Sequence, residues 1–250
     1  MSDRLAPRAS VRTAVVWQVL RALLDERAGG GQLAVLDAGG GTGGFAVPLA
    51  GLGHAVTVVD PSPDSLAALE RRAAEAGVSD RITARQGDAA GLLDLVGPGG
   101  QDVVLCHSVL EVVDDPAAAM AAVAAVLRPG GVVSVLAATR SAAVLARVLA
   151  GRLADAMAML ADPGGRGGPA DPLARRFDLD GLRSLVTGAG LVPGPVHAIQ
   201  VFSDLVPSGL LDAEPEALVA LEERVGGDPA FQPLASQLHL VAERVDRPAP

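Results

Sequence analysis

Several residue types are scarce or missing, and each absence excludes a class of structure. The chain has no lysine and no tyrosine, and Cys106 is its one cysteine, so no internal disulfide can form. The longest apolar runs, such as residues 117–127, are shorter than the roughly 18 to 20 residues of a membrane span. The N-terminus lacks the order of basic, apolar and small residues that is typical of a secretory signal. We therefore expect a cytoplasmic protein with neither a membrane nor a metal as partner.

The charge balance opposes non-specific attraction to polyanions. The formal net charge is −9 at pH 7, and all 20 basic residues are arginine. Residues 140–183 run against this trend, with seven arginines and five acids. This local excess is either a solvated face or a surface that attracts an anionic partner, so it does not decide the class of substrate.

What the first half of the chain does contain is a regular alternation of apolar runs and helical patterns. A first amphipathic helix is expected at residues 10–28, before the first strand. The pattern then predicts strands at 33–36, 56–59, 82–85, 103–106 and 132–136, and helices at 44–52, 62–76, 89–96 and 116–127. Such alternation indicates right-handed βαβ units around a buried parallel sheet.

The second half has a different character. Residues 141–160 predict one long helix, and the glycine- and proline-rich residues 161–172 predict an irregular loop. Whether this loop closes over a substrate is left open. Further along, the pattern predicts a capped helix at 178–190 and two final strands, at 197–202 and 236–244, around a helix at 214–225.

A glycine cluster follows the first predicted strand, in the stretch VLDAGGGTGG at residues 35–44. Glycines at 39, 41 and 43 let the backbone approach a ligand closely. No Gly-Lys-Ser/Thr follows, which excludes a Walker-type phosphate loop. A tight strand-to-helix turn and a dinucleotide-binding turn remain as alternatives. However, Asp37 precedes the first glycine by two residues, where it is poorly placed for a pyrophosphate and suits a cofactor that carries an ammonium group.

Two further acids end the next two strands. Asp60 closes the second strand, where a carboxylate can accept both ribose hydroxyls of an adenosine; its alternative role is to cap the following helix. Asp88 lies in RQGDAAGLL after the third strand. It can accept a hydrogen bond from an adenine amino group while the amides of Ala89 and Ala90 face the ring, or it can serve as another N-cap.

These motifs, together with LRPGGVVSVL, resemble in order and spacing the successive motifs of class I S-adenosylmethionine-dependent methyltransferases. The resemblance spans roughly residues 35–136. It implies S-adenosylmethionine as the cofactor, bound beyond the strand ends at the switch point of the sheet. The implied fold class is α/β: a Rossmann-like, seven-stranded, mostly parallel sheet whose last strand is antiparallel, flanked by helices.

A second resemblance extends over nearly the whole chain. The stretches LCHSVLEVVDDP, RTAVVWQVL, IQVFSDLVP and LEERVGGDPAFQPLASQLHLVAER look like the bacterial tRNA 5-carboxymethoxyuridine methyltransferase family. It implies that Arg12, Gly39, Gly40 and His107 belong to the cofactor site, beside Gly41 of the same turn. Arg12 can then pair with the cofactor carboxylate. An RNA substrate calls for aromatic platforms or a basic groove, and this chain has no tyrosine and a net charge of −9. A small metabolite therefore stays open as the acceptor.

The length of the chain and the change of pattern in its second half indicate how the chain is divided. We expect a single methyltransferase domain over residues 1–250. Its parts are the N-terminal helix at 10–28, a cofactor-binding core at 33–137, a helical and loop-rich cap at 140–175, and the C-terminal part of the sheet at 176–245. The oligomeric state is not predicted.

The chemistry of methyl transfer asks for few catalytic groups. Displacement at a sulfonium is in line, so the protein must align the reactants and exclude water, and no covalent intermediate is needed. An acceptor carboxylate, with a pKa of about 4, is already ionised and needs no base. His107 is then a residue that shapes the cofactor pocket or a structural one, and Arg140 is a candidate partner for the acceptor carboxylate. The rival functions are a non-catalytic cofactor-binding module and a nicotinamide-dependent oxidoreductase.

Overall fold

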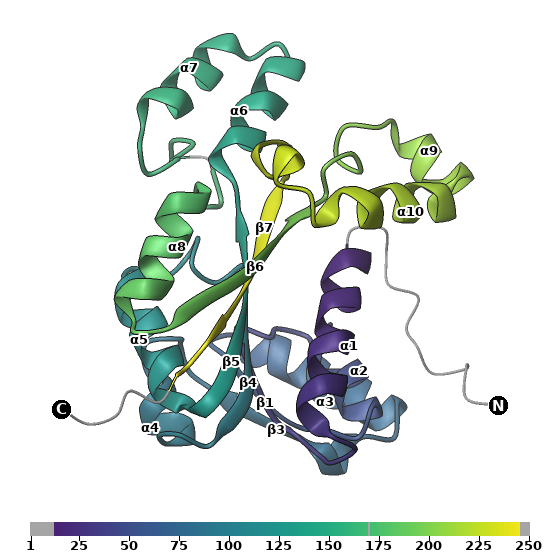
Figure 1. Cartoon of the computed structure of the whole chain (residues 1–250), viewed down its shortest axis with the longest axis vertical. Helices are drawn as coiled ribbons and strands as arrows, with labels where there is room; N and C mark the ends of the chain where they lie inside the picture. Colours follow the sequence, from purple (N-terminus) through teal and green to yellow (C-terminus); the bar gives the residue numbers. More distant parts are fainter. Residues whose placement is uncertain (1–12, 170, 246–250) are drawn as a thin grey trace.

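The computed structural model describes residues 13–169 and 171–245 and contains a seven-stranded sheet in the order β3-β2-β1-β4-β5-β7-β6 (Figure 1). β1 to β5 pair in parallel, and β7 runs antiparallel between β5 and β6. The strands are β1 Ala34–Ala38, β2 Ala55–Asp60, β3 Ile82–Gln86, β4 Gln101–His107, β5 Leu127–Ala138, β6 Val192–Ile199 and β7 Gln237–Glu243. The predicted Rossmann-like sheet with an antiparallel last strand is confirmed.

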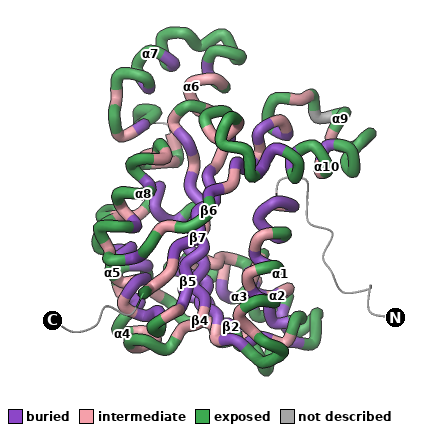
Figure 2. Tube along the Cα trace, in the orientation of Figure 1, coloured by how far each residue is buried: buried purple, intermediate pink, exposed green. Residues whose placement is uncertain are grey.

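Helices cover both faces of this sheet, and the buried residues lie along it (Figure 2). α1, α2 and α3 pack on one face, whereas α4, α5 and α8 pack on the other. α10 contacts both α1 and β6. The bounds are α1 Ala14–Ala28, α2 Ala46–Gly51, α3 Pro63–Glu75, α4 Leu92–Val96, α5 Pro116–Val126, α8 Leu179–Gly188 and α10 Pro215–Gly226.

The long helix predicted at residues 141–160 is wrong, because the segment forms two helices. α6 (Arg140–Leu149) ends before Gly151, whose φ of 71° is left-handed, and α7 (Leu153–Ala161) starts a new direction. The Gly151 N–H donates to the Val148 carbonyl, which closes the turn as glycine commonly does after a helix. The two helices pack together at one end of the molecule (Figure 1).

Three short elements and one strand boundary also differ from the prediction. α9 (Ser208–Ala213) and the 3₁₀ helices η1 (Ser79–Arg81) and η2 (Pro229–Leu234) lie in segments for which no separate element is predicted. β6 begins at Val192, five residues before the predicted strand at 197–202, and ends at Ile199. These differences leave the topology of the sheet unchanged.

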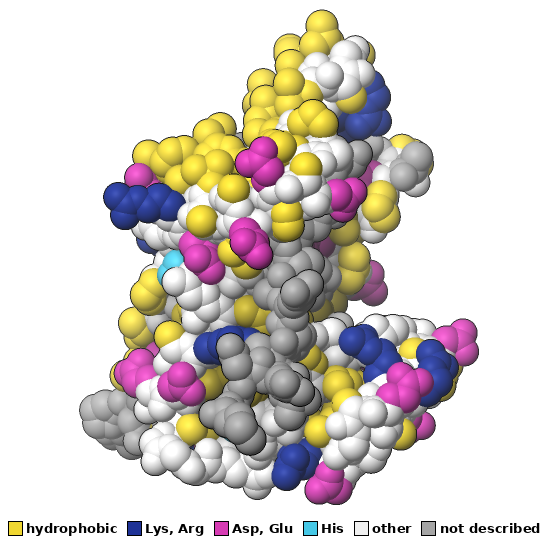
Figure 3. Space-filling model, turned by 90° about the vertical axis from the view of Figure 1, so that its right-hand side faces the viewer, with side chains coloured by type: hydrophobic (Ala, Val, Ile, Leu, Met, Phe, Trp, Pro, Cys, Tyr) yellow, Lys and Arg dark blue, Asp and Glu magenta, His cyan; other side chains and the backbone are white. Residues whose placement is uncertain are grey.

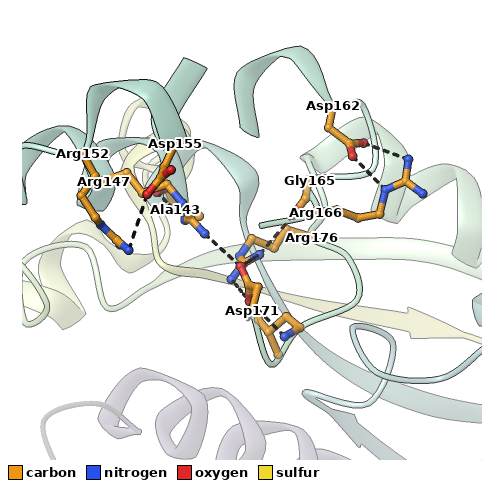
Figure 4. A network of polar contacts seen from close by, with 10 residues as sticks. Ala143, Arg147, Arg152, Asp155, Asp162, Gly165, Arg166, Asp171 and Arg176 are labelled. Atoms are coloured by element: carbon orange, nitrogen blue, oxygen red, sulfur yellow. Dashed lines mark hydrogen bonds and ion pairs between the residues drawn. The ribbon is translucent and has the colours of Figure 1, made fainter. Parts of the chain in front are cut away.

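The loop after α7 is fastened by a buried ion-pair network (Figure 4). The Asp171 carboxylate lies 2.9 Å from Arg147 and 2.8 Å from Arg176, and only 4% of its side chain is exposed. The hydrogen bond from Arg176 is the largest cause that lowers the pKa of Asp171 to about 2. Beyond the loop, the Phe177 N–H donates to the Ala138 carbonyl. The loop is therefore tied both to α6 and to the end of β5.

The surface of the cap formed by α6 and α7 is rich in exposed apolar side chains (Figure 3). They include Leu149, Leu153, Met157 and Leu160. In the part of the chain that the structure describes, no helix combines the length and the apolar character needed to cross a membrane. The location predicted from the sequence stays a prediction.

Candidate functional site

The glycine turn connects β1 to α2 at the edge of the sheet where the parallel strands end. The Gly39 N–H donates to the Val59 carbonyl at 2.7 Å, and the φ of Gly39 is 71°. A Cβ atom on Gly39 would lie 2.6 Å from the side chain of Val109, and one on Gly40 would lie 2.6 Å from the carboxyl of Asp37. The turn thus has no room for side chains at these two positions.

Asp37 is a buried carboxyl group directly beneath this turn. Its side chain is 3% exposed, and Oδ2 has no hydrogen-bond partner within the described chain. Burial, and then the charge of Asp60, raise the pKa of Asp37 to about 7. An unpaired buried acid is costly, so this oxygen is suited to a cationic ligand group, which would restore the carboxylate.

Asp60 ends β2, the strand next to β1, and its carboxylate is held by the backbone. Oδ2 accepts from the Gly41 N–H at 2.9 Å, and Oδ1 accepts from the Ser62 N–H at 2.9 Å. Each oxygen keeps a second lone pair for a ligand hydroxyl. The N-cap of α3 is Ser62, whose hydroxyl accepts from the Ser65 N–H, so Asp60 is not the cap of that helix.

Asp88 orders the turn between β3 and α4. Its Oδ1 accepts from the N–H groups of Ala90 and Gly91, at 3.0 and 2.9 Å. The N-cap of α4 is Gly91, and no side chain caps this helix, so the capping alternative for Asp88 is wrong; the amide of Ala90 is already engaged. A contact of Asp88 or the neighbouring Ala89 with an adenine ring stays a prediction.

His107 is the last residue of β4, and β4 lies next to β1. Chain order reverses between these two strands, which is where open α/β sheets bind ligands. The Nε2 atom is 2.8 Å from the hydroxyl of Ser134, and the ring meets Phe45 edge-on. Nδ1 is buried without a partner within the described residues. Burial lowers the pKa of His107 to about 3, so the imidazole is neutral.

Two predicted residues lie away from this cluster or outside the described residues. Arg140 is the first residue of α6; its guanidinium lies 3.5 Å from the Asp178 carboxylate and donates to the Asp162 carbonyl. A role towards the acceptor stays a prediction for Arg140. Arg12 lies outside the described residues.

Sequence reasoning missed two polar residues behind His107. Ser134 Oγ, which contacts His107, is also 2.6 Å from Nε2 of His239, and both residues are fully buried. Each is a single polar residue inside a short apolar stretch, in VVSVL and LHLVA. That pattern was the available signal, because a buried polar side chain requires a partner.

The site fits an adenosine joined to an amino acid better than it fits a diphosphate. Asp37 would repel phosphate charges and can pair with an ammonium, whereas Asp60 can accept the ribose hydroxyls of either kind of cofactor. The unpartnered atoms Asp37 Oδ2 and His107 Nδ1 belong to adjacent strands, beside a turn too tight for a Cβ. Among the described residues, no group of three His, Cys, Asp or Glu side chains could hold a metal ion.

Comparison with known proteins gives a consistent picture. Residues 35–131 match the model of a family described as a methyltransferase domain. The chain is 38% identical over 133 residues to the tRNA 5-carboxymethoxyuridine methyltransferase of Escherichia coli, covering 52% of this chain and 49% of that protein. It is 39% identical over 104 residues to a ubiquinone biosynthesis O-methyltransferase of Methylocella silvestris, covering 40% and 37%. The chain thus spans about half the length of these curated relatives, or less.

A solved structure supports the fold over nearly the whole chain. An S-adenosylmethionine-dependent methyltransferase from Mesorhizobium loti matches with a TM-score of 0.61 at 19% identity. The match covers 94% of this chain and all of that one, 100%. At this identity the likeness concerns the fold alone, whereas the family match covers the glycine turn, Asp60, Asp88 and His107.

Proposed function

Because residues 35–131 match a methyltransferase-domain family and the fold is similar to that of an S-adenosylmethionine-dependent methyltransferase, we propose that the chain transfers a methyl group from S-adenosylmethionine to an oxygen of its acceptor. The observation that carries the proposal is the unpaired, buried carboxyl of Asp37 beside the glycine turn. Asp37 pairs with the ammonium of the cofactor, and Asp60 accepts hydrogen bonds from its ribose. When bound, the cofactor supplies a methyl group on a positively charged sulfur.

The protein contributes alignment and a dry environment rather than proton transfer. With a pKa lowered to about 3 by burial, His107 is too weak a base to hold a proton taken from a hydroxyl. Asp37, whose pKa is near 7, is committed to the ammonium group of the cofactor. An acceptor that is ionised beforehand fits this site best, and a carboxylate meets that requirement.

Two kinds of carboxylate acceptor are each favoured by an observation. The carboxymethoxy group of a tRNA wobble uridine is favoured by the similarity to the Escherichia coli relative, whose name states that substrate. A small-molecule carboxylate is favoured by a groove of about 390 Å³ between α6 and the segments around Leu205 and Leu234, next to the end of β5. The residues that line this groove are largely apolar, and its volume suits a single metabolite.

The arginines of residues 140–183 favour the small molecule further. Six of the seven have a carboxylate or carbonyl partner within the fold: Arg140, Arg147, Arg152, Arg166, Arg175 and Arg176. Figure 4 shows Arg147, Arg166 and Arg176 turned towards aspartates of the same region. Arg147 and Arg176 are largely buried in their ion pairs and add little to a surface for RNA, whereas Arg152 and Arg166 stay exposed.

A methyl-transfer assay separates these functions. Protein, labelled S-adenosylmethionine and either fractionated tRNA bearing the carboxymethoxy group or a small-molecule extract are incubated side by side. Label released from tRNA by mild base would identify a tRNA ester, and base-labile label in the extract would identify a small ester. Binding of the cofactor without transfer to either would reject the enzymatic proposal and favour a binding module.

A further inference from the structure

Three polar side chains form a hydrogen-bonded row across one face of the sheet. His107 on β4, Ser134 on β5 and His239 on β7 are linked through the serine hydroxyl, at 2.8 and 2.6 Å. In the strand register, His107 pairs with Leu136, and Leu136 pairs with His239. The row therefore runs from the cofactor site into the core, where Ser134 and His239 are fully buried.

Both histidines are neutral, so each has one ring proton to place. Burial lowers the pKa of His107 to about 3 and lowers the pKa of His239 well below its usual value. The Nδ1 atoms of both rings are buried without a partner within the described residues. Ser134 has one hydroxyl proton for two neighbouring Nε2 atoms.

Counting protons leaves three ways to form both hydrogen bonds. If both Nε2 atoms are protonated, the Ser134 hydroxyl proton is left without an acceptor. If only Nε2 of His107 is protonated, the unpaired donor is Nδ1–H of His239. If only Nε2 of His239 is protonated, the unpaired donor is Nδ1–H of His107. Each arrangement leaves one donor without an acceptor, and a buried donor in that state costs roughly 1 to 3 kcal/mol.

In the third arrangement the unpaired donor belongs to His107, the member of the row that lies at the switch point of the sheet. Ser134 and His239 are enclosed by the core, whereas His107 ends β4 at the switch point, beside the glycine turn. His197 lies near His239, with 5.8 Å between the ring centroids, but it accepts no hydrogen bond from Nδ1 of His239. The Nδ1 atoms of both rings are buried without a partner among the described residues.

We propose that His107 donates its Nδ1–H to an oxygen of the bound ligand, and that Ser134 and His239 are positioning residues that hold it in this tautomer. The inference rests on the proposed function, because it requires a ligand at the cofactor site. It also makes His107 a hydrogen-bond donor in the complex, which excludes it as a general base and agrees with an acceptor that has no proton to lose.

Nuclear magnetic resonance tests the tautomer directly. In protein labelled with ¹⁵N-histidine and saturated with S-adenosylhomocysteine, long-range ¹H–¹⁵N correlation spectra identify the protonated nitrogen of each ring. We expect the proton on Nδ1 of His107 and on Nε2 of His239. A proton on Nε2 of His107 would overturn the inference, even with the ligand bound. Binding of S-adenosylhomocysteine is measured separately by calorimetry. If it does not bind, the proposed function is contradicted, and the inference that rests on it is contradicted as well.

Three variants test the positioning role. Ser134→Ala should give a mixture of His107 tautomers and weaken S-adenosylhomocysteine binding by about three- to tenfold, the worth of one neutral hydrogen bond. Ser134→Thr keeps the hydroxyl and should restore the single tautomer. Ser184→Ala, the same substitution at an exposed position of α8, is the control and should change neither measurement. A single tautomer and unchanged affinity in a folded Ser134→Ala protein would contradict the role; if that variant does not fold, the wild-type spectrum alone decides.

Discussion

At the scale of a single residue, Asp37 makes the folded protein sensitive to pH. Burial, and then the charge of Asp60, raise the pKa of Asp37 from 3.8 to about 7. Between these values the folded chain keeps a proton that the unfolded chain has released, so the contribution of Asp37 to stability becomes less favourable as the pH rises. Below about pH 4 both states are protonated, and above about pH 7 the full cost of the buried charge is present.

Replacing Asp37 by asparagine should remove this dependence. In the ligand-free wild type, Asp37 should lower the free energy of unfolding by roughly 1 to 3 kcal/mol between pH 5 and pH 7.5. The Asp37→Asn variant should lack that decline. Urea unfolding at a series of pH values measures both proteins. Parallel stability curves for the two proteins would show that Asp37 does not titrate in this range.

The same titration should appear in cofactor binding, with the opposite sign. An ammonium pairs with the ionised form of Asp37, so the affinity for S-adenosylhomocysteine should rise about five- to tenfold between pH 6 and pH 7.5. Calorimetry at each pH measures this change. The Asp37→Asn variant should bind more weakly and show a flatter profile. Affinity that falls with rising pH in the wild type would contradict the pairing.

At the scale of elements, the glycine turn must both reverse the chain after β1 and pass close to buried side chains. Gly39 and Gly40 let the chain leave β1 and pass close to Asp37 and Val109. At Gly40, an added Cβ would lie 2.6 Å from the Asp37 carboxyl and 2.9 Å from Val58. Neither neighbour is the free end of a long side chain, so the turn itself would have to shift.

Gly40→Ala should therefore damage both stability and binding. We expect a loss of about 1 to 3 kcal/mol in the free energy of unfolding, typical of overpacking, and at least about tenfold weaker binding of S-adenosylhomocysteine. Gly44→Ala is the matched control, since a Cβ there meets nothing within 4 Å. Thermal unfolding and calorimetry compare the two. Equal behaviour of both variants would show that the turn does not depend on the missing side chain.

The loop at residues 162–172 is fastened by Asp171, whose removal leaves two largely buried guanidinium groups unpaired. Asp171→Ala should cost about 2 to 4 kcal/mol and make the loop sensitive to proteases. Arg166→Ala breaks only the exposed pair with Asp162 and should change little. Limited proteolysis with and without S-adenosylhomocysteine measures the loop. Rapid cleavage in the wild-type protein that stops on ligand binding would show a mobile lid instead of a fixed wall.

The elements that the sequence predicts best are those whose signal is local. The βαβ units of the first half follow from apolar periodicity, and Asp37, Asp60 and His107 follow from their places at strand ends. The start of β6 was missed because Pro193, Gly194 and Pro195 are unfavourable in a strand; β6 is an edge strand, where proline is tolerated.

Other features depend on contacts that no local pattern contains. Gly151 alone did not mark the break between α6 and α7, since a single glycine inside a helical pattern is often tolerated. The row of His107, Ser134 and His239 joins residues more than 100 positions apart, and only the antiparallel insertion of β7 beside β5 brings them together.

At the scale of the whole molecule, the cofactor residues and the cap lie at the same edge of the sheet. The glycine turn, Asp60 and His107 follow the ends of β1, β2 and β4, and α6 follows the end of β5. The groove of about 390 Å³ along α6 includes Ala138 and Thr139 at the end of β5 in its lining. The net charge of −9 opposes the attraction of a polyanionic acceptor by charge alone.

The most direct test of the account is a calorimetric titration of the protein with S-adenosylmethionine, S-adenosylhomocysteine and NAD. We predict binding of the first two and no comparable binding of NAD, because Asp37, beside the glycine turn, favours an ammonium and repels a diphosphate. In the Asp60→Ala variant, the affinity for S-adenosylhomocysteine should fall by one to two powers of ten, the worth of roughly 1.5 to 3 kcal/mol. Preferential binding of NAD, or unchanged affinity in the variant, would contradict the assignment of this site.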